Sequence, residues 1–157
     1  MKYVRWAMGY GLIFALVAGI LALAAMVRLV PIDPLVWHVD PSQFRLWEGV
    51  AKTEAEVMQT PAGAVARVPG LGAGGLRRLN AIALATPRTV VLAGSVAKGR
   101  ITWVTRSALW GFPDITTAGI GADEVGYIWA RQRYGSVDGG VNLARLRAWL
   151  AALDQGG

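Results

Sequence analysis

The chain has no cysteine and only one histidine, His38, among its 157 residues. Without cysteine it can form no disulfide and no thiolate metal site, and it has no cysteine nucleophile. A single histidine cannot build a multi-histidine metal centre. We therefore expect neither a metal ion nor a cofactor.

Sequence signatures of the common enzyme classes are missing as well. A serine hydrolase built from Ser107 or Ser136 with His38 would lack the G-x-S-x-G turn that exposes such a nucleophile. Two carboxylates, Glu54 and Glu56, lie in a polar segment and not in an apolar pocket suited to acid–base chemistry. The sequence therefore predicts that the protein is not an enzyme and has no catalytic residue.

Positive charge is spread thinly along the chain. The formal net charge is +6, from 16 basic and 10 acidic residues, and Lys2, Arg5 and Arg28 flank one apolar stretch. The remaining residues carry a net charge near +3. The chain has no arginine-rich run and no interleaving of basic with aromatic residues, the patterns that mark nucleic-acid surfaces. We therefore predict no nucleic-acid partner.

What the chain does have is a long apolar stretch, Trp6–Val27, without a single charge. As a helix it would be about 33 Å long, enough for a hydrocarbon core of roughly 30 Å. Small residues at Ala22 and Ala24 resemble a signal-peptide cleavage site, but the run is longer than the apolar region of such a peptide. We therefore predict an uncleaved transmembrane anchor, with residues 1–30 forming a short tail and the membrane helix.

The charges at the two ends of this stretch predict its orientation. Lys2 and Arg5 precede it, whereas Arg28 is soon followed by Asp33 and Asp40. Cytoplasmic flanks carry the excess of lysine and arginine, and a chain without cysteine is compatible with the bacterial periplasm. We therefore predict a single-pass protein in the lipid of a bacterial inner membrane, with a cytoplasmic amino terminus and a periplasmic domain.

One face of the apolar stretch carries a small residue at every fourth position, at Ala7, Gly11, Ala15 and Gly19. In lipid, helices associate through close backbone packing, which small residues at this spacing permit. The pattern predicts packing against transmembrane helices of a larger complex. The alternative is that alanine and glycine are simply abundant in this chain.

The anchor is followed by prolines at Pro31, Pro34 and Pro41, which cannot extend a helix. We therefore expect residues 31–47 to form an extended linker to a domain over residues 48–157.

Within this domain, both kinds of secondary structure are predicted. Alternating apolar residues and turn signals predict strands within 57–69, 89–96, 100–107, 113–120 and 125–133, and helical periodicity predicts helices at 76–85 and 142–153. Short turns between successive strands require antiparallel pairing. Each helix has one apolar stripe, and both can cover the same sheet face. The sequence therefore predicts an α+β fold: a small two-layer domain with an antiparallel sheet and two packing helices.

Four glycines crowd residues 68–76, ahead of the first of these helices. Backbone amides at a helix start can bind a phosphate. However, the spacing matches neither the G-x-x-x-x-G-K-[ST] motif nor G-x-G-x-x-G after a strand. A flexible loop is the simpler interpretation, with a phosphate cradle as the alternative.

Charged residues at strand ends and turns form a candidate polar site, made of Arg106, Arg131, Arg133, Asp114 and Asp138. Arg131 and Arg133 are two residues apart on a strand and so share a face. Arg88 and Arg145 belong to the same group of polar residues at strand ends and turns. Some of these arginines either form a shallow anion site or pair with Asp114 and Asp138, which would hold the loops together. The second interpretation is the simpler one.

Several short strings occur together in the second half of the chain. They are Thr86-Pro87-Arg88-Thr89, Thr105-Arg106-Ser107, Gly111-Phe112-Pro113-Asp114 and Arg133-Tyr134-Gly135-Ser136, with Asp138, Gly140-Val141-Asn142 and Arg145. In this combination residues 80–153 resemble the domain-of-unknown-function family numbered 1499. The start of the chain, with Asp33-Pro34, Trp37-His38 and Asp40-Pro41, is similar to its membrane-anchored proteobacterial members. The resemblance implies the same fold and brings no established activity or cofactor.

Two functions fit these observations. The first is a non-catalytic accessory subunit, or an assembly or stability factor, of a larger inner-membrane complex, because the small-residue face suits helix packing. The alternative is a periplasmic binding module for an anionic small molecule or lipid headgroup, because arginine forks suit carboxylates and phosphates.

Overall fold

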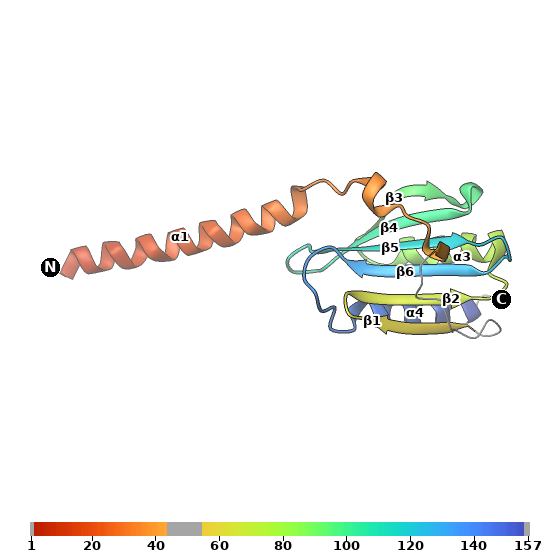
Figure 1. Ribbon diagram of the computed structural model, residues 1–157. Coiled ribbons are helices and arrows are strands. Elements are labelled where there is room, and N and C mark those ends of the chain that lie inside the picture. The colour runs from red at the N-terminus through yellow and green to blue at the C-terminus, as the bar shows by residue number, and fades with distance from the viewer. Residues whose placement is uncertain (1, 44–54, 156–157) are drawn as a thin grey trace.

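Helix α1 (Lys2–Leu29) projects from one end of a body built from a sheet and further helices (Figure 1). The computed structural model describes residues 2–43 and 55–155, with side chains from residue 10 onward, so Glu54 and the side chain of Ala7 lie outside the described part. The segment Tyr10–Leu29 is long and apolar enough to cross a membrane, a property that membrane anchors and signal sequences share, and only 6% of it is buried.

An antiparallel sheet forms the centre of the body, which confirms the predicted α+β class. Its six described strands are β1 (Glu56–Thr60), β2 (Gly63–Val68), β3 (Thr89–Ser95), β4 (Arg100–Arg106), β5 (Pro113–Ile120) and β6 (Gly126–Gln132), in the spatial order β1-β2-β6-β5-β4-β3. The hairpin of β1 and β2 joins the meander of β3 to β6 through antiparallel pairing of β2 with β6. One sheet therefore unites the two groups of strands that the sequence predicts.

Helices α3 (Gly72–Ala85) and α4 (Val141–Gln155) lie on one face of this sheet (Figure 1). Helix α3 carries the chain from β2 to the far edge of the sheet, where β3 begins. It starts at Gly72 and not at Leu76, so Gly72, Gly74 and Gly75 belong to its first turn, and only Gly70 lies in the preceding turn. The two packing helices are thus those that the sequence predicts.

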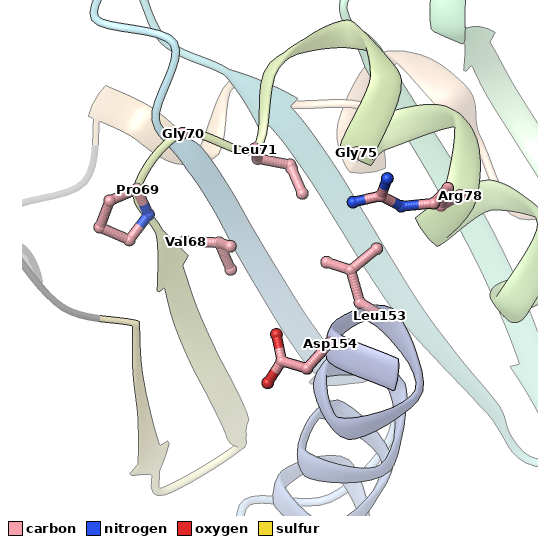
Figure 2. Close-up of a pocket in the computed structure, with 8 residues that line it drawn as sticks. All are labelled: Val68, Pro69, Gly70, Leu71, Gly75, Arg78, Leu153 and Asp154. Atoms are coloured by element: carbon pink, nitrogen blue, oxygen red, sulfur yellow. The ribbon is translucent and has the colours of Figure 1, made fainter. Parts of the chain in front are cut away.

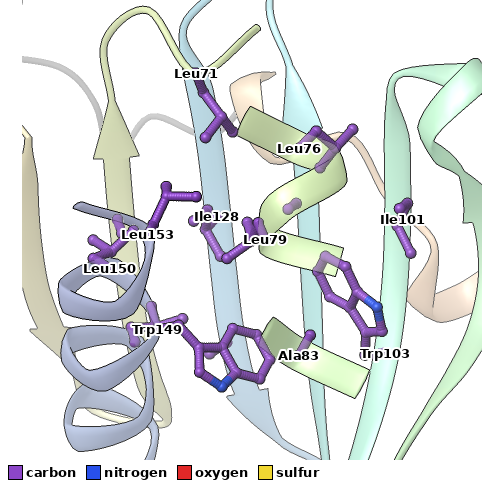
Figure 3. Packing of buried hydrophobic residues seen from close by; sticks show 14 of the residues in the cluster. Leu71, Leu76, Leu79, Ala83, Ile101, Trp103, Ile128, Trp149, Leu150 and Leu153 are labelled. Atoms are coloured by element: carbon purple, nitrogen blue, oxygen red, sulfur yellow. The ribbon is translucent and has the colours of Figure 1, made fainter. Parts of the chain in front are cut away.

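The hydrophobic core lies between these helices and the sheet (Figure 3). Leu76 and Leu79 of α3 are fully buried there. Trp103 of β4 and Trp149 of α4 meet edge to face, with ring centroids 5.8 Å apart. The buried Trp103 indole donates a hydrogen bond to Asn80 Oδ1 at 3.0 Å, so burying its N–H leaves no donor unsatisfied.

The other sheet face is covered by the chain that follows α1, which differs from the extended linker predicted over residues 31–47. Residues 30–43, here called the covering segment, contain the one-turn helix α2 (Pro34–Trp37) and the 3-10 turn η1 (Pro41–Gln43). In Figure 1 the segment crosses the sheet on the side away from α3 and α4. The prolines do stop α1, but the segment then gains hydrogen bonds on the sheet. The predicted boundary at residues 47 and 48 lies outside the described residues.

Candidate functional site at the end of the apolar helix

The predicted site arginines reach backbone carbonyls of the chain that leaves α1. Arg106 Nη1 donates to the Val27 carbonyl at 3.3 Å, and Arg133 Nη1 donates to the Val30 carbonyl at 3.2 Å. The last carbonyls of a helix lack partners within the helix, and positive charge near a helix C-terminus is favourable. These two guanidinium groups therefore stabilise the carboxyl end of α1 against the sheet.

The third arginine, Arg131, is 7% exposed. Its Nη2 donates to the Trp37 carbonyl at 2.6 Å, and its guanidinium carbon lies 4.9 Å from the Trp37 ring centroid and 3.7 Å from that of Trp129. Burial lowers the pKa of Arg131 to about 10, so the side chain stays charged at neutral pH. The cation between two indole rings holds the covering segment onto β6.

The last turn of α1 also contacts the loop between β4 and β5. Arg28 Nη2 donates to the Leu109 carbonyl at 2.9 Å, and Val27 is buried. Gly111 in this loop has φ +75, and a Cβ there would lie 2.9 Å from Arg28 Cγ. Glycine at this position therefore lets the loop close on the helix.

A chain of hydrogen bonds joins His38 to the sheet. Arg100 Nε donates to His38 Nε2 at 3.3 Å, and His38 Nδ1 lies 2.8 Å from Thr102 Oγ1. Thr102 Oγ1 lies 2.9 Å from Thr117 Oγ1, which donates to the Trp37 carbonyl at 3.2 Å. Arginine cannot accept a hydrogen bond and a carbonyl cannot donate one. The chain therefore runs in one direction, with the proton of a neutral His38 on Nδ1.

Acid should weaken this network, because protonated His38 Nε2 would face the N–H of Arg100. Burial, together with the charges of Arg100 and Lys98, lowers the pKa of His38 from its ordinary value of 6.5. The unfolded chain thus binds the proton at higher pH than the folded chain, and stability is lost as the pH falls below about 6.5. We expect the contribution of His38 to the free energy of unfolding to decrease between pH 7 and pH 5.

Urea unfolding of the full chain in detergent measures this pH effect, and His38→Gln is the control. The variant should lack the His38 contribution to the slope between pH 7 and pH 5. His38 is the only histidine, so its ring proton signal in NMR gives the pKa directly. A value at or above 6.5 would contradict the prediction.

The two predicted site aspartates belong to the α4 side of the sheet. Asp114 Oδ2 accepts from Arg145 Nη2 at 2.7 Å, and Asp138 accepts from the backbone N of Asn142 at 2.9 Å, beside the start of α4. Burial raises the pKa of Asp114, although Arg145 acts in the opposite direction. Asp114 therefore pairs with Arg145, one of the arginines of the predicted polar group, whereas Arg106, Arg131 and Arg133 donate to backbone carbonyls instead. Alternation along the strands places the Asp114 side chain on the other face.

The glycine-rich segment borders a pocket of about 250 Å³ (Figure 2). Leu71 occupies the space that side chains at Gly75 and Gly126 would need, and a Cβ at Gly75 would lie 2.7 Å from Leu71 Cδ1. Arg78 and Asp154 both line the pocket. The negative charge of Asp154 offsets the positive charge of Arg78, so the pocket is poorly suited to binding an anion. These glycines allow close packing, and the phosphate-cradle interpretation gains no support.

The described side chains at the end of α1 are arranged to hold this helix and the covering segment on the sheet. Among the described side chains, no group of three or more carboxylate or imidazole residues is placed to hold a metal ion. Ser107 Oγ accepts from the Phe112 backbone N at 3.0 Å and so closes the β4–β5 loop. Both ring nitrogens of His38 are engaged in hydrogen bonds. The site binds the backbone of its own chain.

Sequence reasoning missed the polar partners of the covering segment on the sheet, which are Arg100, Thr102 and Thr117. Arg100 and Thr102 are two residues apart on β4 and therefore share a face. Thr102 and Thr117 are fully buried. Polar residues alternating with core residues in interior strands were the available signal that something covers the second face.

Comparisons with known proteins add no relative. No protein-family model, no curated protein and no solved structure matches the chain. The resemblance to the domain-of-unknown-function family numbered 1499 therefore stays a prediction from the sequence.

Proposed function

We propose that the protein is a non-catalytic accessory subunit, or an assembly or stability factor, of a larger membrane complex, anchored by α1. The fastening of α1 to the body is the observation that carries this proposal. Arg28, Arg106 and Arg133 hold the end of the helix. Arg131 and His38 hold the covering segment that follows it.

A simple anchor needs no such fastening, since a flexible linker keeps a domain near a membrane equally well. A fixed angle between helix and body is useful when both contact the same partner. Pre-organised contacts lose less conformational entropy on binding, and two contacts made by one rigid body reinforce each other. In this proposal α1 contacts the complex within the bilayer, and the body contacts it outside.

The small-residue face of α1 supports a helical partner. A Cβ added at Gly11 or Gly19 would meet nothing within 4 Å, and Ala15 is exposed. This part of the face is therefore open to the close approach of another helix. Transmembrane helices of the complex and membrane lipid are the partners that we propose.

We further propose that α1 crosses a bacterial inner membrane with its amino end in the cytoplasm and the body in the periplasm. The support is the charge bias, with Lys2 and Arg5 ahead of the apolar stretch and Asp33 and Asp40 after it. Protease added to intact spheroplasts tests this orientation. We expect the body to be digested, and a body protected from the protease would place it in the cytoplasm.

The test of function is co-purification. We expect Gly11→Leu to reduce the yield of partner membrane proteins several-fold, because the leucine side chain prevents close helix approach. The tagged full chain is extracted in mild detergent, and its partners are quantified by mass spectrometry. Gly9→Leu is the matched control, since residue 9 lies about 200° around the helix from residue 11.

Two outcomes contradict the proposal. Equal yields from Gly11→Leu and Gly9→Leu would discard helix packing through this face. Recovery of the native chain only as a free monomer, from cells grown under several energy regimes, would argue against membership of any complex.

The alternative, a binding module for an anionic small molecule or lipid headgroup, has less support. Its three arginines, Arg106, Arg131 and Arg133, already donate to backbone carbonyls. An anion at Arg131 would also have to compete with the Trp37 and Trp129 rings, whose centroids lie 4.9 and 3.7 Å from the guanidinium carbon.

A further inference from the structure

We propose that the end of the body nearest α1 rests in the headgroup layer of the bilayer, with apolar side chains inserted and the exposed Arg28 beside lipid phosphates. This docking end consists of Leu29, Leu109, Trp110, Phe112 and Tyr134. The inference rests on the proposed function only in taking α1 to cross a membrane, and it requires no partner protein.

The position of the docking end follows from the contacts of the last turn of α1. Arg28 donates to the Leu109 carbonyl, and the Val27 carbonyl accepts from Arg106 at the end of β4. The loop between β4 and β5 therefore lies beside the last turn of the helix. Since the apolar segment Tyr10–Leu29 ends at this turn, a bilayer crossed by α1 has its surface at the level of the loop.

The side chains at this end have the chemistry of a membrane interface. Leu109 is 74% exposed, Trp110 39%, Phe112 39% and Tyr134 36%. The Phe112 and Tyr134 rings lie edge to face with centroids 6.1 Å apart, so the two loops present one aromatic surface. Tryptophan and tyrosine prefer the headgroup level, and a contiguous exposed apolar patch marks a contact surface.

A shallow crevice of about 240 Å³ continues this surface between the end of α1 and β3. Its lining is apolar, including Leu29, Val90 and Val91, except for the guanidinium groups of Arg28 and Arg106. Val90 and Val91 are exposed. Arg106 is committed to the carbonyls of Val27 and Gly111, but Arg28 is exposed and has N–H donors beyond those bonded to the Ala24 and Leu109 carbonyls. An apolar crevice beside this cation suits a phospholipid, because a guanidinium group binds phosphate oxygens and the apolar walls accept the adjoining acyl carbons.

The opposite end of the sheet has a different surface. Its described turns, residues 96–99 and 121–124, contribute none of the large exposed hydrophobic side chains. They present Lys98, Asp123 and Glu124 to solvent instead. This difference between the two ends favours lipid as the occupant of the end next to the helix, since general surface hydrophobicity would appear at both ends.

Depth-dependent quenching of single labels tests the docking in the full chain. The chain has no cysteine, so Leu109→Cys, Ala97→Cys and Val17→Cys each carry one NBD fluorophore. Ala97 lies in η3 (Val96–Lys98), one strand length or about 20 Å from the docking end. The labelled chains are reconstituted into nanodiscs of phosphatidylcholine and phosphatidylglycerol in equal parts. The discs contain no nitroxide, a shallow nitroxide near the top of the acyl chain, or a deep nitroxide near its end.

We expect the shallow nitroxide to reduce emission roughly twofold for the label at 109, as for groups at the headgroup–acyl boundary. We expect the deep nitroxide to do the same for the label at 17, near the middle of the apolar segment, and both to leave the label at 97 unchanged. Quenching at 17 without quenching at 109 overturns the docking and leaves the anchor intact. Equal quenching at 97 and 109 also overturns it. No quenching at 17 removes the anchor, and the docking with it. Failure of co-purification affects none of these readings, so the two proposals fail separately.

Discussion

The variant Arg131→Ala is expected to unfold with a free energy roughly 3 kcal/mol below that of the native chain. The substitution removes the 2.6 Å hydrogen bond to the Trp37 carbonyl and the cation between the Trp37 and Trp129 rings. Alanine cannot fill the space left between the rings, and such voids destabilise a folded protein. The covering segment should therefore loosen on the sheet.

Two effects limit the loss. Burial disfavours the charge of Arg131 and lowers its pKa to about 10, so removing that charge recovers part of the desolvation cost. The Trp37 carbonyl also keeps the hydrogen bond from Thr117 Oγ1 at 3.2 Å. Arg131→Ala leaves no unpaired buried charge behind. We therefore expect a smaller loss than the roughly 5 kcal/mol that follows when one partner of a buried ion pair is removed.

Urea unfolding of the detergent-solubilised full chain measures this difference, and Arg147→Ala is the control because Arg147 is an exposed arginine of α4. Release of the covering segment is read separately from spin labels at Val17→Cys and Ala97→Cys. Their distance distribution should broaden in Arg131→Ala. A loss within about 0.5 kcal/mol of the control, with an unchanged distribution, would show that Arg131 does not hold the segment.

The elements of the fold could be predicted because their signals are local. The alternation in β6, with Ile128 and Ala130 toward the helices, is readable within one strand. Arg131 and Arg133, which the same alternation places on one face, both donate to the covering segment, although Arg133 lies just past the end of β6. Pairing of β2 with β6 brings Gly63 next to Arg131, and no local pattern specifies which distant strands meet. The single six-stranded sheet therefore came only from the structure.

The partners of the site residues could not be predicted for a related reason. Arg106 and Arg133 bond to carbonyls of Val27 and Val30, 79 and 103 residues away. Every residue has a backbone carbonyl, so such an acceptor leaves no mark in the sequence. Aspartates are visible as possible partners of arginine, and Asp114 does pair with Arg145, one of the arginines of the predicted polar group. The sequence does not indicate which arginine is the partner.

The covering segment had a signal that admitted two interpretations. Three prolines exclude a long helix over residues 31–41, but they do not distinguish a free linker from a segment packed on a surface. Trp37 and His38 lie in this stretch, and both become half-buried on the sheet. A tryptophan in a free linker would expose a large apolar surface to water. The aromatic residue was therefore a better guide than the prolines around it.

The other large effect is expected for Gly94→Ala, which should lower the free energy of unfolding by about 4 kcal/mol. Gly94 lies in β3 opposite Ile101, just past the bulge between Val91 and Ala93, and has φ +82, where a side chain is strained. An added Cβ would also overlap the Arg100 carbonyl oxygen and would lie 2.7 Å from His38 Cε1. The backbone of β4 cannot move without loss of its pairing, so the alanine should push His38 off the sheet.

Gly99→Ala separates backbone strain from this steric overlap. Gly99 has φ +67, similar to Gly94, but a Cβ there would meet nothing within 4 Å. We expect Gly99→Ala to lower the free energy of unfolding by only about 1–2 kcal/mol. The additional loss in Gly94→Ala then measures the steric overlap with His38 and β4. The NMR titration of His38 supplies a second reading, because a ring displaced into water should regain a pKa near 6.5 in Gly94→Ala and keep the lowered value in Gly99→Ala. The prediction is contradicted if the two alanine variants have the same free energy of unfolding and the same His38 pKa. Gly94 would then be required only for the backbone conformation of β3, and the contact of His38 with it would not help to hold α1.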